Sequence, residues 1–412
     1  MVNFVDSVFL VYMFVGLYML SLLILIYLPN RKRMYGYPRL QKEEGVSLVM
    51  PCYNEEKEIG AAIESLLAMD WPREKMEIIV VDDKSSDNSV EIVRKFARKY
   101  KNVRLIVLPE NSGGAAVPTN TGVKAARFSY IAVTDADSTP SPDALRKMIG
   151  HLQADKKVGA VTCAVLSKSP GNFMQRLQAI EYAAIAFSRR LLDLVDSVYV
   201  TPGPFALYRK KDLVRAGLFD PTNMTQDIEI VWRMLSKGYM ARMCLDAQVR
   251  SATPETFRGW WKQRIRWNIG GKQTLWKYKG LVFRKGILGL FIIPFFSASL
   301  FIGLFGLGFF VYLMSRRLLV SYFSTAYSLA ANTAVLHLQD LSFAPSVLNY
   351  FGVILFVLGA AFTLFGLSVI ERDMLKWKHT VTIFFYLIVY LAVYPFLLVV
   401  SLWKMFTGNY SW

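Results

Sequence analysis

Four long apolar runs constrain the fold of this chain more than any other feature of its sequence. They lie at about 8–28, 287–314, 346–370 and 380–403. Each is close to or above the roughly 20 apolar residues that a helix needs to cross a bilayer. We therefore expect an N-terminal transmembrane helix within 1–32 and an α-helical transmembrane domain of about three spans within 286–412.

The first apolar run is followed by the basic cluster Arg31, Lys32 and Arg33. A secretory signal peptide carries its positive charge before the apolar stretch and ends at a small-residue cleavage site. The sequence shows neither feature, so an uncleaved anchor is expected, with its C-terminal end in the cytoplasm.

The stretch 318–339 leaves two arrangements open because it is apolar but rich in Ser, Thr, Ala and Asn. If it spanned the membrane, the basic loop with Arg372, Lys376 and Lys378 would fall outside, against the positive-inside bias. If it lies on the outer surface or re-enters, this loop falls inside. The second arrangement is expected, and it leaves four spans in all.

The net charge of +17 narrows the possible partners. A basic balance suits nucleic acid, an anionic membrane surface or a phosphorylated substrate. Much of the excess flanks the apolar runs, at 31–33 and 264–285, which favours membrane lipids and not nucleic acid.

The three cysteines, Cys52, Cys163 and Cys244, share no metal-ligand spacing, and no disulfide framework is indicated. The non-membrane part is expected to be cytoplasmic and reduced.

Residues 45–255 have the pattern of an α/β domain. Short β-branched runs alternate with segments of helical periodicity. The expected strands are 46–51, 77–83, 103–108 and 130–137, and the expected helices are 58–69, 89–100 and 144–153. Such alternation predicts a mostly parallel sheet with helices on both faces. Ligands of these sheets bind beyond the carboxyl ends of the strands.

Acidic residues stand at two of these strand ends. Asp135 and Asp137 can together hold a hard divalent cation, Mg²⁺ or Mn²⁺, which neutralises a diphosphate, although an Asp-x-Asp pair can also simply shape a turn. Asp82 and Asp83 can either cap the next helix or hydrogen-bond a nucleotide base or ribose. Residues 51–55, after the first strand, can shape the same pocket.

Two later motifs add candidates for catalysis. Thr225-Gln226-Asp227 opens a helix, where Asp227 can act as a cap or as a general base for an attacking hydroxyl. Residues 256–285 are rich in Trp, Lys and Arg, which is typical of amphipathic helices in the membrane interface. They contain Gln263-Arg264-Ile265-Arg266-Trp267, in which Arg can clamp a diphosphate and Trp can stack on a sugar.

The acidic pair, Asp-x-Asp, Thr-Gln-Asp and Gln-Arg-x-Arg-Trp occur in this order, between one apolar run and three others. In this the chain resembles the family 2 glycosyltransferases, within them the branch of cellulose, hyaluronan and poly-N-acetylglucosamine synthases. The resemblance covers roughly 45–285. It implies a nucleotide-diphospho-sugar transferase domain of the GT-A fold over 45–255, and a metal-dependent transfer of a hexose by single displacement with inversion.

The resemblance also implies roles for single residues. Asp82 or Asp83 would contact the nucleotide, with Tyr53 and Glu55 nearby. Asp135 would contact the donor and Asp137 would be the principal metal ligand. Asp227 would be the catalytic base. The donor diphosphate would be bound by Gln263, Arg264 and Arg266, and Trp267 would lie at the acceptor.

The sequence departs from polymer synthases of this branch at two motifs. Where they usually carry Asn-x-Gly-Lys-Ala, residues 111–115 read Asn-Ser-Gly-Gly-Ala, and Pro118 follows. Gln226 stands where Glu is usual. The membrane part is also small. These departures weaken the expectation of polymer synthesis but not that of sugar transfer.

Two acceptors therefore stay open, and the donor can be GDP-mannose, UDP-glucose or UDP-N-acetylglucosamine. The favoured hypothesis is transfer to a lipid-linked glycan or a polyprenyl-type lipid. The alternative is a processive polysaccharide synthase that also secretes its product, but about four spans with few ionisable residues offer little to line a sugar channel. A catalytically silent membrane scaffold is disfavoured because Asp137 and Asp227 are both present.

Overall fold

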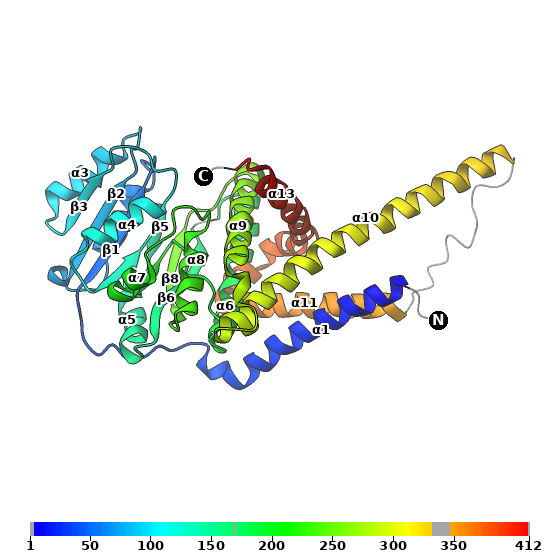
Figure 1. Ribbon diagram of the computed structural model, residues 1–412, viewed down its shortest axis with the longest axis horizontal. Helices are drawn as coiled ribbons and strands as arrows, with labels where there is room; N and C mark the ends of the chain where they lie inside the picture. The colour runs from blue at the N-terminus through cyan, green and yellow to red at the C-terminus, as the bar shows by residue number, and fades with distance from the viewer. Residues whose placement is uncertain (1–3, 169, 332–346, 411–412) are drawn as a thin grey trace.

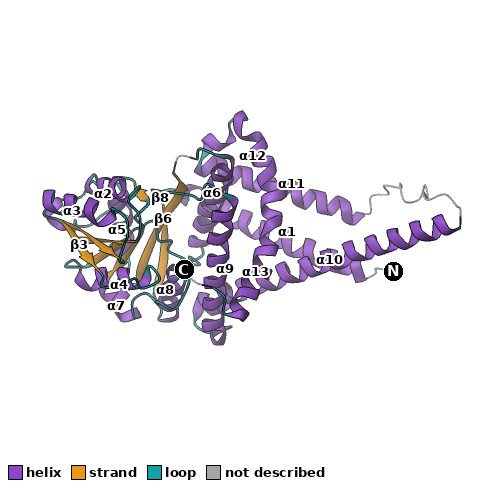
Figure 2. Cartoon of the chain, turned by 90° about the horizontal axis from the view of Figure 1, so that it is seen from above, coloured by secondary structure: helices purple, strands orange, loops and turns teal. Residues whose placement is uncertain are grey.

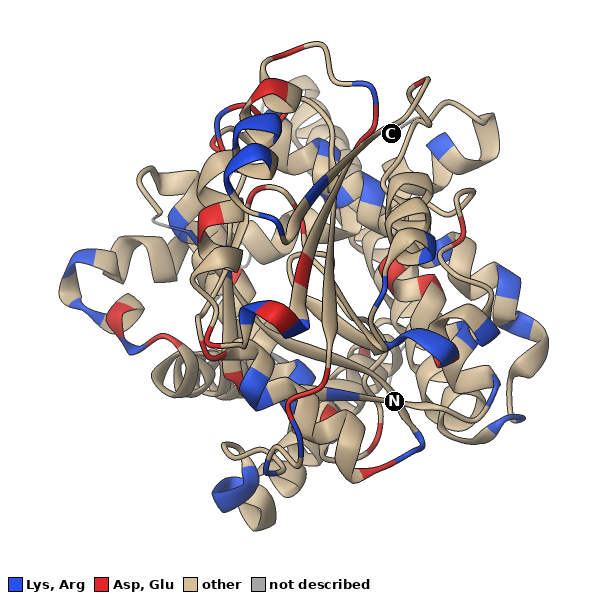
Figure 3. Cartoon of the chain, turned by 90° about the vertical axis from the view of Figure 1, so that its left-hand side faces the viewer, with Lys and Arg blue, Asp and Glu red and all other residues tan. Residues whose placement is uncertain are grey.

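The computed structural model describes residues 4–168, 170–331 and 347–410. A sheet domain and a set of long helices form its two ends, and two helices, α6 (Phe173–Asp193) and α9 (Phe257–Tyr278), lie between them (Figures 1 and 2). Lys and Arg alternate with Asp and Glu over the sheet end (Figure 3), so this end has the mixed charge of a solvated surface.

The domain is built on an eight-stranded sheet with the order β3-β2-β1-β4-β7-β6-β8-β5. Its strands are β1 (Val46–Cys52), β2 (Met76–Asp82), β3 (Val103–Val107), β4 (Tyr130–Val133), β5 (Ser138–Pro140), β6 (Val158–Ser167), β7 (Ala206–Arg209) and β8 (Met240–Ser251). The pairs β1–β2, β2–β3, β1–β4 and β6–β8 are parallel, and the pairs β4–β7, β6–β7 and β5–β8 are antiparallel. The sheet is therefore mixed, with a parallel N-terminal half.

Helices cover both faces of the sheet because the strands are apolar on both sides. In β1, Leu48 and Met50 belong to the core under one face and Val49 to the core under the other. The first core includes residues of α2 (Ile59–Leu67), α3 (Ser89–Lys99) and α5 (Ala144–Ala154). The second includes residues of α4 (Ala116–Ala125), α6, α7 (Lys210–Ala216) and α8 (Gln226–Ser236).

The predicted α/β fold is confirmed, and the four expected strands are present. The expectation of a mostly parallel sheet holds for the first half only. The second half, with β7 antiparallel to both β4 and β6, was not recognised. β7 is only four residues long, so its apolar pattern gives little signal in the sequence.

Among the described residues, four helical segments are long and apolar enough to cross a membrane: Phe4–Arg33, Leu288–Ala330, Gly352–Ile370 and Trp377–Thr407. Their number equals that of the expected spans. They contain α1 (Phe4–Asn30), α10 (Ile293–Ala330), α11 (Val347–Ile370), α12 (Thr380–Phe385) and α13 (Tyr394–Thr407). Short helical turns complete the chain: η1 (Arg31–Arg33), η2 (Arg73–Lys75), η3 (Lys279–Leu281), η4 (Leu288–Ile292), η6 (Arg372–Leu375), η7 (Trp377–His379), η8 (Tyr386–Tyr390) and η9 (Leu391–Val393).

The stretch 318–339 is only partly described. Residues 318–330 continue α10 without a break, and 332–346 lie outside the described residues. The basic loop after α11 lies against the sheet domain, because Arg250 of β8 donates to the Glu371 carboxylate at 3.1 Å. This contact places the loop beside the sheet domain.

Candidate active site

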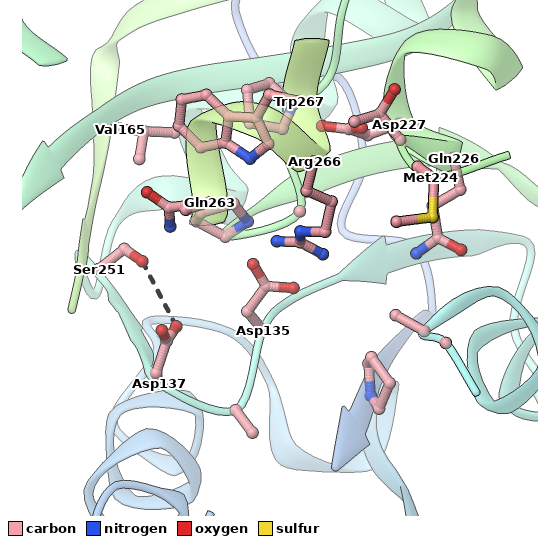
Figure 4. Close-up of a pocket in the computed structure, with 18 of the residues that line it drawn as sticks. Asp135, Asp137, Val165, Met224, Gln226, Asp227, Ser251, Gln263, Arg266 and Trp267 are labelled. Atoms are coloured by element: carbon pink, nitrogen blue, oxygen red, sulfur yellow. Dashed lines mark hydrogen bonds between the residues drawn. The ribbon is translucent and has the colours of Figure 1, made fainter. Parts of the chain in front are cut away.

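One cavity of about 740 Å³ opens at the carboxyl ends of β1 and β4, between the sheet, α6, α8 and α9. β1 lies between β2 and β4, and the chain reaches these two neighbours in opposite directions from it, which is where ligands of such sheets bind. Of the predicted site residues, the cavity is lined by Tyr53, Glu55, Asp83, Asp135, Asp137, Asp227, Gln263, Arg266 and Trp267. Figure 4 shows most of the charged members facing one another.

Asp135 and Asp137 are brought to the cavity by the turn that follows β4. Ala136 between them packs into the core under the sheet, which directs its two neighbours away from that core. The Oδ1 atom of Asp137 accepts from the Ser138 hydroxyl at 2.8 Å and from the Ser251 hydroxyl at 3.3 Å. Asp137 is thereby fixed through one oxygen.

Asp135 stands directly over Gly203. A methyl group on Gly203 would lie 2.7 Å from Asp135 Oδ1, so any side chain at residue 203 would force the Asp135 carboxylate to shift. Figure 4 places Arg266 between Asp135 and Asp227. Its positive charge therefore acts on both carboxylates from within the cavity.

Burial makes this acidic cluster costly to ionise. It raises the pKa of Asp135, and the charges of Asp137 and Asp227 raise it further. Burial also raises the pKa of Asp227, while Arg266 acts in the opposite direction. The pKa of Glu55 is raised to about 7 by burial and by the neighbouring charge of Asp137. Such a cluster favours a bound cation.

Asp227 lies in the first turn of α8, which begins at Gln226. Its Oδ1 atom accepts from the backbone N–H of Ile228 at 3.1 Å, so the helix start orients the carboxylate. A carboxylate that is held in place and faces the cavity has the placement of a general base.

Helix α9 presents one face to the cavity. Gln263, Arg266 and Trp267 have the i, i+3, i+4 spacing of a single helix face, and all three line the cavity. Arg264 does not line it. Its guanidinium is buried against Glu181 of α6, and it lies over the Trp267 ring at 4.0 Å. Arg264 thus lies outside the cavity lining and packs between Glu181 and Trp267, and its expected contact with the donor stays a prediction.

The two residues of the acidic pair after β2 are placed differently. Asp83 lines the cavity and accepts from the backbone N–H and the hydroxyl of Ser112 at 3.0 and 2.9 Å. Asp82 is fully buried outside the cavity and accepts from the Ser85 N–H at 3.0 Å. Of the two alternatives, the geometry favours Asp83 as the residue near a nucleotide.

Comparison with known proteins gives a family match for part of the chain that lines this cavity. Residues 47–215 match the family model described as Glycosyl transferase family 2. Over this range the chain is similar to that family, and the range holds Asp135 and Asp137, whereas Asp227 and α9 follow it.

Among curated proteins, the chain is 34% identical over 233 residues to a poly-beta-1,6-N-acetyl-D-glucosamine synthase of Staphylococcus aureus (strain COL), with 56% of each chain covered. It is 32% identical over 256 residues to the protein of the same name from Staphylococcus epidermidis, with 62% of this chain and 61% of the relative covered. The match thus spans somewhat more than half of these relatives.

Among solved structures, the chain resembles the mannosyltransferase PcManGT from Pyrobaculum calidifontis in complex with GDP-Man and Mn²⁺. The TM-score is 0.56 at 19% identity, and the likeness covers 98% of this chain and 99% of that one. The likeness extends over the sheet domain and the membrane helices together. The fold is thus that of a GT-A glycosyltransferase joined to candidate membrane-spanning helices.

The carboxylate oxygens in the cavity suit a divalent metal ion that is also bound by phosphate oxygens of a substrate. Among the described residues, three or more His, Cys, Asp or Glu side chains nowhere converge as a complete metal cage. Mg²⁺ is typically bound through one or two carboxylates plus substrate phosphates, and carboxylates suit Mn²⁺ as well. Asp137 keeps its Oδ2 atom free of hydrogen bonds to described residues, and Asp135 lies beside it in the same cavity.

The sequence missed one wall of the cavity. Tyr182, Ile185 and Arg189 of α6 line it, at the 3- and 4-residue spacing of one helix face. Asn172 and Gln175 form a capping box at the start of this helix, which was a readable signal. Gly203, between Pro202 and Pro204, was also missed.

Proposed function

We propose that this chain transfers a single sugar from a nucleotide-diphosphate donor to a lipid-linked glycan or polyprenyl-type lipid at the membrane. One observation carries the proposal. The cavity that holds Asp135, Asp137 and Asp227 has α6 as a wall, and α6 packs on the membrane helices through Phe187, whose ring lies 5.4 Å from that of Phe362 in α11. The cavity therefore lies one helix away from the candidate spans, which supports an acceptor held in the membrane.

The roles of the cavity residues follow from their positions. Tyr53 and Asp83 bind the nucleoside at the ends of β1 and β2, and Arg266 with Gln263 binds the diphosphate. Asp227 takes the proton of the attacking acceptor hydroxyl, and Trp267 stacks against the acceptor sugar. The hydroxyl displaces the nucleoside diphosphate directly, so the anomeric configuration inverts and no enzyme nucleophile is needed.

We assign the metal ion to Asp137, with Asp135 beside it. Mg²⁺ or Mn²⁺ bound there supplies positive charge that stabilises the leaving diphosphate. Asp137 is held for this task by Ser138 and Ser251, and Arg266 adds a fixed positive charge on the other side of Asp135.

The cytoplasmic side is proposed for the catalytic domain on the basis of charge. The basic turn after α1 lies against the domain, because Arg190 donates to the backbone carbonyl of Arg33. The loop with Arg372 lies there too, through the contact between Arg250 and Glu371. Basic residues that flank spans concentrate on the cytoplasmic face.

A processive polysaccharide synthase is the second candidate, favoured by the poly-beta-1,6-N-acetyl-D-glucosamine synthases among the relatives. A secreting synthase needs helices that enclose a path for the polymer. In the most apolar window of each candidate span, only 11% to 22% of the residues are buried. The spans are thus loosely associated, which supports the lipid acceptor.

Incubation of the purified full chain with labelled GDP-mannose, UDP-glucose or UDP-N-acetylglucosamine, Mn²⁺ and a membrane lipid extract tests the proposal. We expect label from one donor in the organic phase, lost in the Asp227→Asn variant. Label confined to a large water-soluble product would overturn the lipid acceptor in favour of the synthase. Absence of any transfer, with donor binding intact, would overturn both.

A further inference from the structure

Arg189 of α6 is a buried cation that lacks a protein partner. The residue is 6% exposed and lines the cavity. Its Nε atom is buried without a hydrogen-bond partner, and its guanidinium forms no hydrogen bond or ion pair with any residue that the structure describes. The two other buried arginines in the described chain are paired, Arg190 with Asp193 and Arg264 with Glu181.

An unpaired charge at this depth destabilises the folded protein. Burial lowers the pKa of the Arg189 guanidinium, and the charges of Tyr199, Cys163 and Asp227 act in the opposite direction. None of these forms an ion pair with it within the described chain. A buried guanidinium that faces a cavity and lacks a counter-charge has the properties of a binding site for an anion.

The position of Arg189 points to the source of that anion. Tyr199, which also lines the cavity, contacts the ring of Phe296 in α10 at 4.7 Å between ring centroids. Phe187, two residues before Arg189, packs on Phe365 of α11 at 5.8 Å. Helix α6 thus lies against α11, and Tyr199, which acts on the Arg189 guanidinium, lies against α10. The proposed nucleoside residues Tyr53 and Asp83 instead follow the ends of β1 and β2.

We propose that Arg189 binds the phosphate group of the lipid-linked acceptor, in a subsite separate from the one for the donor diphosphate. This rests on the proposed lipid acceptor. The planar guanidinium can donate two parallel N–H bonds to phosphate oxygens, which fixes the acceptor relative to Asp227. A neutral glycan would leave the same guanidinium unpaired.

Binding of phytanyl phosphate and of the uncharged phytanol to the full chain in detergent tests this subsite. We expect the Arg189→Met variant to bind phytanyl phosphate at least tenfold more weakly and phytanol unchanged, with UDP and GDP affinity preserved. The exposed Arg215→Met is the matched control and should alter neither. The thermal midpoint of Arg189→Met should be equal to or above that of the wild type, because the variant loses an unpaired buried charge.

Other results would overturn the inference. Weaker UDP and GDP binding in Arg189→Met would make Arg189 a donor ligand, and a lower thermal midpoint would make it structural. Equal binding of phytanyl phosphate and phytanol to the wild type would show that no subsite recognises the phosphate. Millimolar inorganic phosphate that displaces phytanyl phosphate, with no preference for the lipid form, would show the same for a lipid phosphate. The assay needs no sugar transfer, so a failure of the proposed function, seen as product in the aqueous phase, is distinguished from a failure here.

Discussion

Gly270 of α9 lies against Thr225, at the start of α8, so closely that a methyl group on Gly270 would be 2.5 Å from the Thr225 backbone nitrogen and 2.1 Å from its hydroxyl oxygen. Two residues after Thr225 stands Asp227, the proposed base. The close approach therefore couples the helix that carries Gln263, Arg266 and Trp267 to the helix that carries the base.

The Gly270→Ala substitution should consequently displace Asp227 from α9. Backbone atoms cannot yield as a flexible side chain does, so we expect kcat to fall at least tenfold, since misplacement of a catalytic group by about 1 Å can cost about 100-fold. Gly271→Ala is the matched control, because a methyl group there meets nothing within 4 Å. Transfer assays on both variants check this, and equal activity of the two would contradict it.

Glu181 pairs with Arg264 and also accepts hydrogen bonds from two tyrosines of the membrane part. The Tyr390 hydroxyl donates to the Glu181 carboxylate at 2.6 Å, and Tyr394 donates to it as well. The side chains of Glu181 and Arg264 are only 5% and 1% exposed. Replacement by Glu181→Gln leaves a buried guanidinium without its counter-charge, so we expect a loss of about 3 kcal/mol in the free energy of unfolding.

Glu91→Gln is the control for that loss, because Glu91 pairs with Arg94 at the surface. Such a pair contributes about 0–1 kcal/mol. Denaturant unfolding in detergent, followed by tryptophan fluorescence, compares the two variants. A Glu181→Gln variant as stable as Glu91→Gln would show that the buried network does not hold the domain to its membrane helices.

The site residues that could be predicted from the sequence are those whose chemistry is local. Asp135 and Asp137 follow a strand that can be recognised by its run of apolar residues. Asp227 lies at the start of a helix that can be recognised by the helical spacing of its apolar residues. Because parallel strands end at one edge of a sheet, the sequence also predicts that residues after these strand ends lie close together. Arg264 was assigned to the donor because the motif gives residue types and not the helix face each one occupies.

Arg189 and Gly203 could not be predicted because their roles depend on distant segments. Arg189 and its neighbour Arg190 are the same residue type and differ only in the groups around them in the fold. The sequence does not show that Asp193 pairs with Arg190 and not with Arg189. Gly203 matters because Asp135, from another part of the chain, stands over it. The antiparallel pairs of β7 were missed for a similar reason, since pairing direction is set by tertiary contacts.

The acidic cluster should make the stability of the metal-free protein fall as pH rises. Burial and Asp137 raise the pKa of Glu55 from 4.5 to about 7, so between these values the folded state binds more protons than the unfolded state. The free energy of unfolding then decreases with rising pH in this window. We expect the thermal midpoint to decrease from pH 5 to pH 7 in EDTA, and to decrease less in Glu55→Gln. The exposed Glu110→Gln should behave as the wild type, and an identical slope in Glu55→Gln would contradict the assignment.

Removal of divalent metal should abolish transfer, and Asp137 should set the metal requirement. Asp137 accepts from two hydroxyls through Oδ1, which leaves Oδ2 without a hydrogen bond to a described residue. Asp137→Asn removes the negative charge, so we expect at least a tenfold rise in the Mn²⁺ concentration that supports half-maximal nucleotide binding. Ser251→Ala removes only the 3.3 Å hydrogen bond to Asp137. It should change this Mn²⁺ concentration less than threefold. Calorimetric titration of UDP or GDP at a series of Mn²⁺ concentrations measures both, and full transfer activity in EDTA would exclude the metal from the mechanism.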